Sequence, residues 1–206
     1  MNWEVVKDIA INFGYIIAAV VIASTTIKKK LDGYFNGKKE NVPDKVIKQS
    51  DIDNKILTKM EHTKEALGAD RILVFDFHNG EHFANGRSAL RMSASYEVTK
   101  YGIERKQNNL QKLPLSILPN LIKEVLEKGF FVVDDFEKFK DMQPEYSICA
   151  SLGMKSLYNY IIKDEKGAPV GFVSIEFKNI TENINAELTH KLVWFIEEKI
   201  NDLVEK

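Results

Sequence analysis

The sequence predicts an α+β domain whose mainly antiparallel sheet has five or six strands with helices on one face, preceded by a single N-terminal transmembrane helix. Three observations lead to this prediction: a long uncharged stretch near the N-terminus, amphipathic helices at both ends of the remaining chain, and two late strands joined by a turn. After the N-terminal segment the expected order is helix, strands, helix, strand, helix, two strands, helix. A mixed order that closes on a hairpin is typical of α+β architecture.

The composition fits one globular domain with an appendage. The chain has 206 residues, of which 44% are hydrophobic and 29% are charged, and these fractions exclude disordered and collagen-like classes. Its 29 basic and 30 acidic residues leave a net charge of -1, so it lacks the basic field that non-specific nucleic-acid binding uses, and we expect no nucleic-acid partner. One cysteine excludes an intramolecular disulfide and a cysteine-based zinc site.

The stretch from Ile9 to Ile27 contains 19 residues and no charged side chain. As a helix it would be about 28 Å long, close to the ~30 Å hydrocarbon core of a bilayer. Lysines follow it at 28–30 and 38–39, whereas Lys7 is the only lysine before it, and this asymmetry places the C-terminal side in the cytoplasm. We therefore expect residues 1–30 to anchor a single-pass protein in the inner (cytoplasmic) membrane. The alternatives are a buried core helix and the uncleaved signal sequence of a secreted protein.

A short basic connector, residues 31–42, is expected between the anchor and the soluble domain, residues 43–206. Residues 28–42 contain five lysines and two acidic residues, a local charge of +3. The lysines either contact anionic lipid head groups or are simply solvated. Pro43 then begins an amphipathic helix that extends to Leu67. This helix either packs on its own domain or pairs with a second copy of the chain.

Two strands are expected next. The first, 71–77, ends in the turn signal His78-Asn79-Gly80, and a second Asn-Gly pair follows at 85–86. The second strand is expected at 90–98, followed by a polar loop at 103–112. The later elements are expected as helices at 116–128, 145–152 and 183–204 and as strands at 130–133, 155–162 and 170–177.

The late part of the chain also carries a family resemblance. The stretch SLGMKSLYNYIIKDEKGAPVGFVSIEF contains a glycine-bearing pattern made by Gly153, Met154, Ser156, Leu157, Ile161, Gly167, Val170, Gly171, Val173 and Ile175. Together with the strand that carries VFDF and with FFVVDDF, it resembles a GAF domain from about residue 51 to residue 206. This resemblance implies a GAF-like sheet and a small-molecule sensor fold related to PAS.

The segments FHNG, HFANG and SASYEV are similar to short proteins of bacteria and their phages that pair an anchor with a GAF-like domain. No residues of this chain align with those that hold a cyclic nucleotide or haem in characterised GAF proteins. Cys149 does not lie in a bilin-attachment motif. The cofactor therefore remains unknown.

The densest group of polar side chains lies on the loop after the first strand and on the strand that returns from it. We expect the ligand-binding residues to be His78, Asn79, Glu81, His82, Asn85, Arg87, Ser93, Tyr96 and Glu97, with Asp76 and Ser95 beside them. Histidine and asparagine hydrogen-bond planar or phosphorylated ligands, and arginine pairs with anions. The alternative is two Asn-Gly turns whose polar side chains are satisfied locally.

Other chemistry has weaker support in the sequence. A metal site would use His78 and His82 with Glu81 or Glu97. The two histidines are four residues apart, a spacing that brings them together only in a helix, and their segment contains two Asn-Gly turns. Cys149 lies in an apolar segment and is expected in the core, and Asp134-Asp135 is expected to cap the next helix. No Walker, GxSxG, HExxH or GxGxxG motif is present, so catalysis has no positive support.

Two functions follow from these expectations. The first is a membrane-tethered GAF-like sensing or regulatory binding domain without its own catalysis, which takes a small-molecule ligand and forms a homodimer through the helices at 43–67 and 183–204. The second is a structural or assembly protein of a membrane or virion, with the GAF-like body as a degenerate scaffold. A polar-lined cavity behind the FHNG segment would favour the first, and a filled core would favour the second. A nucleotide hydrolase using His78 and Glu97 is a third, less favoured alternative.

Overall fold

The computed structural model describes residues 25, 27–28, 42–82, 86 and 88–202. The expected membrane helix and connector therefore lie almost entirely outside the described residues. None of the helices that the structure does describe is both long and apolar enough to cross a membrane. The chain divides into two compact units, Met1–Lys48 and Gln49–Lys206, and the second contains the sheet.

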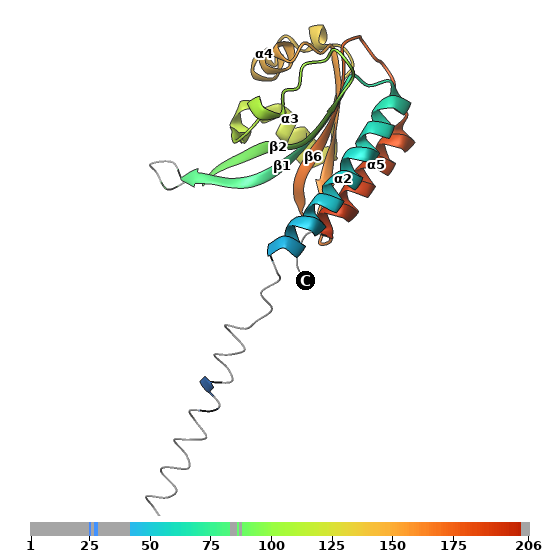
Figure 1. Ribbon diagram of the computed structural model, residues 1–206. Coiled ribbons are helices and arrows are strands. Elements are labelled where there is room, and N and C mark those ends of the chain that lie inside the picture. Colours follow the sequence, from blue (N-terminus) through green and yellow to red (C-terminus); the bar gives the residue numbers. More distant parts are fainter. Residues whose placement is uncertain (1–24, 26, 29–41, 83–85, 87, 203–206) are drawn as a thin grey trace, which may run out of the picture. The chain divides into compact units, whose positions relative to one another are not determined.

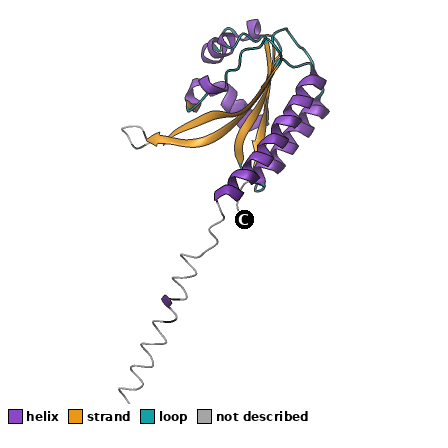
Figure 2. Cartoon of the chain, viewed as in Figure 1, coloured by secondary structure: helices purple, strands orange, loops and turns teal. Residues whose placement is uncertain are grey.

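The described part of the second unit contains one sheet of six strands in the order β3-β2-β1-β6-β5-β4, and all paired neighbours are antiparallel (Figure 2). The strands are β1 Arg71–His82, β2 Ser88–Thr99, β3 Leu113–Pro114, β4 Phe130–Val133, β5 Ser156–Lys163 and β6 Pro169–Phe177. The expected antiparallel α+β fold is confirmed.

In the described part of the chain, four longer helices surround this sheet: α2 Val42–Leu67, α3 Pro119–Lys128, α4 Gln143–Ser151 and α5 Ala186–Asn201. Three short 3-10 helices, Gln107–Asn109, Leu115–Ile117 and Phe136–Phe139, lie in the connections. Figure 1 shows α2 and α5 side by side on one face of the sheet and α3 and α4 on the other. The expectation of helices on one face only is therefore wrong.

The central strand explains why both faces are covered. Successive side chains of a strand point to opposite faces, and in β1 both sets are apolar. Leu73 and Phe75 pack in the cluster under α3 and α4, while Ile72 and Val74 pack in the cluster under α2 and α5. A strand that is buried on both faces reads as a continuous apolar run, and RILVF is such a run.

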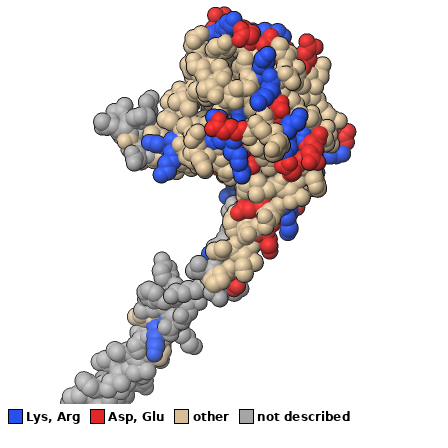
Figure 3. All heavy atoms as spheres, turned by 45° about the horizontal axis from the view of Figure 1, so that its top comes forward, with Lys and Arg blue, Asp and Glu red and all other residues tan. Residues whose placement is uncertain are grey.

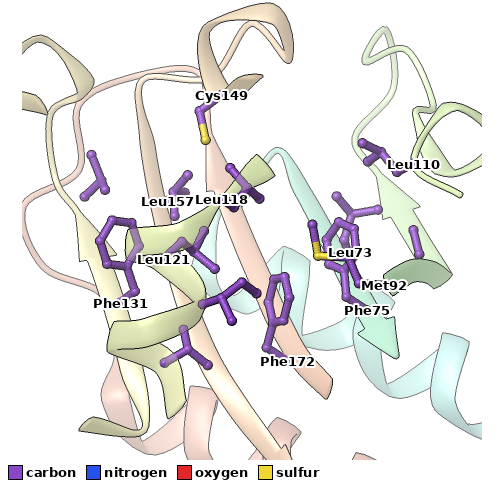
Figure 4. Packing of buried hydrophobic residues seen from close by; sticks show 14 of the residues in the cluster. Leu73, Phe75, Met92, Leu110, Leu118, Leu121, Phe131, Cys149, Leu157 and Phe172 are labelled. Carbon is purple, nitrogen blue, oxygen red and sulfur yellow. The ribbon is translucent and has the colours of Figure 1, made fainter. Parts of the chain in front are cut away.

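The cluster under α3 and α4 is tightly filled. Figure 4 shows its side chains converging from both sides of the space between sheet and helices. The rings of Phe75 and Phe172 stack with centroids 4.7 Å apart. Leu121, Ile122 and Val125 form the buried side of α3.

The cluster under α2 and α5 is formed by the apolar stripes of the two helices. Ile56 and Met60 of α2 and Leu192 and Ile196 of α5 are completely removed from solvent. Gly68 ends α2 with φ at +67°, a left-handed conformation that glycine adopts without strain. At the other end of the chain, the side chain of Asn185 caps α5 by accepting the Leu188 N–H at 3.1 Å.

The first two strands are longer than expected. The pair Asn79-Gly80 does not form the turn of the hairpin, because Asn79 pairs with Leu90 inside the ladder. Gly80 is needed there for space, since a Cβ at this position would lie 2.0 Å from the carbonyl oxygen of Ala89. The β1–β2 hairpin consequently extends past the rest of the sheet (Figure 1).

The loop expected at 103–112 runs along the outer edge of β2. Beyond the short pairing with β3, carbonyl groups of this edge accept hydrogen bonds from side chains of the loop. Gln107 Nε2 donates to Ser95 O at 2.6 Å, Gln111 Nε2 to Ala94 O at 2.8 Å, and Arg105 Nη2 to Glu97 O at 2.9 Å. Side chains thus satisfy backbone groups that a neighbouring strand would otherwise bind.

Candidate functional site

An open cleft of about 510 Å³ lies on the α2/α5 face of the sheet. We call it the helix cleft. Residues of α2 and α5 line it together with residues of strands β1, β2 and β6: Gln49, Asp53, Asp76, Phe77, Ser95, Tyr96, Val170 and Ile200. Polar groups from the first helix and the hairpin base therefore meet an apolar side chain of the last helix in one hollow.

A β-bulge decides which side chains of β2 face this cleft. Tyr96 pairs with Val74, and Ser93 pairs with Asp76. A step of two residues along β1 therefore corresponds to a step of three residues along β2. Val74 and Asp76 share a face, and therefore Tyr96 and Ser93 share it too. Without the extra residue at the bulge, Ser93 and Tyr96 would point to opposite faces. The hydroxyl of Ser95, inside the bulge, donates to Val74 O at 3.2 Å.

A hydrogen-bonded chain joins the hairpin base to α2. The Tyr96 hydroxyl donates to Asp53 Oδ1 at 2.6 Å, and Gln49 Nε2 donates to the same oxygen at 2.7 Å. Burial raises the pKa of Tyr96 well above its ordinary value, and the hydrogen bond and negative charge of Asp53 raise it further. Tyr96 is therefore a hydrogen-bond donor at every physiological pH.

Asp76 is the second carboxylate of the cleft. Burial raises its pKa, while the neighbouring Ser95 hydroxyl and His78 oppose this rise. His78 Nε2 lies 2.9 Å from Ser93 Oγ, and that hydroxyl also accepts the Lys112 N–H at 2.8 Å. The hydroxyl of Ser93 and the imidazole of His78 are thus held in place next to Asp76.

Of the nine expected binding residues, the structure brings His78, Ser93 and Tyr96 together at or beside this cleft. Asn79 and His82 are exposed on the extended hairpin. The backbone of Glu81 belongs to β1, whereas its side chain, and the whole of Asn85 and Arg87, lie outside the described residues. Among described residues, no group of histidine, cysteine and acidic side chains is arranged to hold a metal ion.

Glu97 lies apart from the other expected residues. It pairs with Leu73, so its side chain points to the α3/α4 face, where it is 1% exposed. Its carboxylate accepts the backbone N–H groups of Lys106 and Gln107 at 2.9 to 3.1 Å. Glu97 therefore holds the loop along the edge of β2 and does not reach the helix cleft.

A buried ion cluster that we did not expect from the sequence surrounds Glu97. Arg71 Nε and Nη2 contact Glu176 Oε2 at 2.7 and 2.6 Å, and Arg71 Nε lies 3.9 Å from Glu97. Burial raises the pKa of Glu176 although Arg71 opposes this rise. The sequence contains one indication of this ion cluster, because Arg71 and Glu176 are charged residues in the otherwise apolar runs RILVF and SIEF.

The interior next to this ion cluster has almost no free space. A void of about 30 Å³ lies between the sheet, α3 and α4, and its polar wall is formed by Asn159, Ser174 and Glu176. This is roughly the volume of one water molecule in the liquid. Cys149 lines the void and is buried, as expected, and burial raises the pKa of its thiol far above the ordinary value.

Asp134 and Asp135 have structural partners. Asp135 Oδ1 accepts the Glu137 N–H at 3.0 Å and so caps the helix Phe136–Phe139, which confirms the expected cap. Asp134 pairs with Lys138 at 2.8 Å.

Figure 3 shows acidic and basic side chains interspersed on the described surface in view, without a continuous basic stripe.

Two other open hollows have charged groups that are already engaged. In the hollow between α2 and β2, Glu61 pairs with Lys64, and Arg105 lies 3.6 Å from Glu97. In the hollow of about 480 Å³ beside α4, Glu137 pairs with a lysine of the following turn. Among the described hollows, the helix cleft is therefore the best candidate site for a ligand.

Comparison with solved structures identifies the fold. No protein-family model matches the chain, and no curated protein matches it. Among solved structures, the phycocyanobilin-bound GAF domain of a cyanobacterial phytochrome matches with a TM-score of 0.58 and 15% identity, over 76% of this chain and 88% of that one. The blue-light-absorbing PixJ GAF domain of Thermosynechococcus elongatus also has a TM-score of 0.58, with 11% identity over 76% of this chain and 86% of that one.

The red/green cyanobacteriochrome NpR6012g4 matches with a TM-score of 0.57 and 13% identity, over 74% of this chain and 95% of that one. The GAF-like fold expected from the sequence is thus confirmed over about three quarters of the chain. Identities this low establish the fold and leave the ligand open.

Proposed function

We propose that this chain is a membrane-tethered regulatory domain with a GAF-like fold that binds a small ligand in the helix cleft and has no catalysis of its own. One observation carries the proposal. The cleft joins polar groups of the first helix and the hairpin base with Ile200 of the last helix in a hollow large enough for a small molecule. A ligand there would contact both helices that bracket the sheet.

The sequence supports the tether. The uncharged stretch from Ile9 to Ile27 is long enough to cross a bilayer, and the lysines after it favour a cytoplasmic position for the domain. In this proposal the protein is a single-pass component of the inner membrane. Protease treatment of sealed inverted vesicles tests the orientation, because a cytoplasmic domain is digested there and a domain on the other side is protected.

The bond between Tyr96 and Asp53 supports a route from ligand to helix. A ligand that takes over either group would break the link between the hairpin base and α2. Since α2 follows the connector directly, its shift would be passed toward the membrane or to a second copy of the chain. In this proposal the homodimer forms through α2 and α5, and light scattering of the full chain in detergent tests it.

Native mass spectrometry of the full chain, extracted from its host in a mild detergent, tests the ligand. We expect a retained small molecule on the wild-type chain and loss of that mass from an Asp53→Asn variant. Tyr146→Phe is the matched control, because the Tyr146 hydroxyl bonds the exposed Glu137 at 3.1 Å, away from the cleft. Equal retention by both variants would exclude the helix cleft as the binding site.

A second candidate is a structural or assembly role in a membrane or virion. The interior void of about 30 Å³ favours it, because this space holds no ligand larger than a water molecule. In that case the polar groups of the helix cleft only fix the hairpin to α2. A chain that carries no retained small molecule but stays associated with one defined protein after crosslinking would support this candidate.

A further inference from the structure

The charged groups of the helix cleft have one sign. Its described lining contains two carboxylates, Asp53 and Asp76, and no lysine or arginine. Neither carboxylate forms an ion pair with another described residue. The basic group that acts on Asp76 is the imidazole of His78. A ligand that enters the cleft therefore meets a negative potential.

The hydrogen-bonding groups of the cleft are mainly acceptors. The Tyr96 hydroxyl and the Gln49 amide both donate to Asp53 Oδ1, so these two donors are already used. Among described residues no hydrogen bond reaches Asp53 Oδ2. An ionised carboxylate offers about four acceptor positions, of which Asp53 uses two. The cleft thus has acceptor capacity to spare, which suits a ligand group that only donates.

The remaining side-chain walls are apolar. Val170 of β6 and Ile200 of α5 line the cleft beside the carboxylates. The ring of Phe77 packs against Phe172 on the opposite face of the sheet. Apolar side chains favour the hydrocarbon part of a ligand. A cavity of about 510 Å³ lies within the range of small-molecule sites.

We infer that the helix cleft binds a small organic cation. Its ammonium or amidinium group would donate to Asp53 and Asp76, and its hydrocarbon part would lie against Val170 and Ile200. This inference rests on the proposed function and adds the chemical class of the ligand. It also explains why Asp76 lies half-buried in a cleft whose described lining holds no lysine or arginine.

Three probes of similar shape and different charge test the inference: benzylammonium, benzyl alcohol and benzoate. Each is titrated at neutral pH into the ¹⁵N-labelled full chain in neutral detergent micelles, and binding is followed by NMR at the amides of Asp76, Ser95 and Tyr96. We expect benzylammonium to bind at least about tenfold more tightly than benzyl alcohol, since a charge-assisted hydrogen bond is about twice as strong as a neutral one, and this difference in free energy corresponds to about tenfold in affinity. Benzoate should leave these amides unchanged.

Two variants sharpen the result. Asp76→Asn should weaken benzylammonium binding about tenfold and leave benzyl alcohol binding unchanged. Asp141→Asn removes an exposed carboxylate outside the cleft and should change neither. Because partition into micelles is the same for all variants, only binding in the cleft distinguishes them.

The outcomes separate this inference from the function on which it rests. If benzyl alcohol or benzoate shifts the cleft amides as strongly as benzylammonium, the cation preference is wrong and the cleft remains a ligand site. If no probe shifts these amides, both the cation preference and the location of the ligand site are overturned.

Discussion

Polar side chains on the two faces of the sheet differ in their burial and in how fully they are hydrogen-bonded. On the α3/α4 face, Arg71, Glu97 and Glu176 are almost fully buried and hydrogen-bonded to one another or to backbone groups. On the α2/α5 face, Asp53 and Asp76 line an open cleft and keep unused acceptor capacity. Buried polar groups are costly unless they are fully satisfied. The first set therefore holds the fold together, whereas the second is available to a ligand.

The largest expected effect is the loss of Arg71. An Arg71→Met variant leaves two buried carboxylates without their shared cation, and removal of one partner from a buried pair costs about 3–5 kcal/mol. Urea unfolding of the full chain in detergent, followed by circular dichroism, measures this change in the free energy of unfolding.

Arg105 offers a matched control for this substitution. It also lies near Glu97, at 3.6 Å, but its side chain is 65% exposed. Arg105→Met is expected to cost less than about 1 kcal/mol, because exposed ion pairs contribute little. Equal losses from both variants would contradict the contrast between buried and exposed charges.

A smaller effect is expected at the link between the hairpin base and α2. Tyr96→Phe removes the hydrogen bond to Asp53 and is expected to cost about 1 kcal/mol. It should also increase hydrogen exchange in the first half of α2, which this bond fixes to the sheet. Unchanged exchange in α2 would show that the bond does not couple the two elements.

Asp76→Asn is expected to stabilise the protein at neutral pH. Burial raises the folded-state pKa of Asp76 above its ordinary value of 3.8, so the ionised carboxylate is less stable in the folded than in the unfolded chain. Below pH 3.8 the group is neutral in both states and the variant should match the wild type. As the pH rises from the ordinary pKa through the folded-state pKa, the variant should become more stable than the wild type. Unfolding measured from acid to neutral pH tests this.

Trp194 provides the smallest expected effect on stability. Its side chain is 65% exposed on α5, and exposed substitutions usually change the free energy of unfolding by less than about 0.5 kcal/mol. Trp194→Ala should therefore unfold like the wild type. If the variant alone loses dimers in light scattering, the exposed side of α5 belongs to the proposed dimer interface.

Much of the fold followed from sequence patterns. Each expected strand and helix in the described domain is present, because apolar periodicity and glycine stops report local structure directly. The covering of both sheet faces was missed, although the apolar run RILVF indicates a strand buried on both sides. The length of the hairpin was missed because Asn79-Gly80, a common turn pair, lies inside a ladder.

The site was harder to predict than the fold. His78, Ser93 and Tyr96 lie on one face only because of the bulge at Ser95, and the position of the bulge depends on how the two strands pair. Asp53 joins them from α2, 43 residues before Tyr96 in the sequence. Arg71 and Glu176 are separated by 105 residues, so their pairing depends on the neighbourhood of β1 and β6.

The side chains of Arg105, Gln107 and Gln111 occupy carbonyl groups along the outer edge of β2. An additional strand arriving at this edge would have to displace three side-chain donors before it could form its own ladder. Copies of the domain held at high local density are therefore prevented from joining there into a continuous intermolecular sheet. Any assembly at this side of the domain would therefore have to use side-chain surfaces and not the backbone groups of β2.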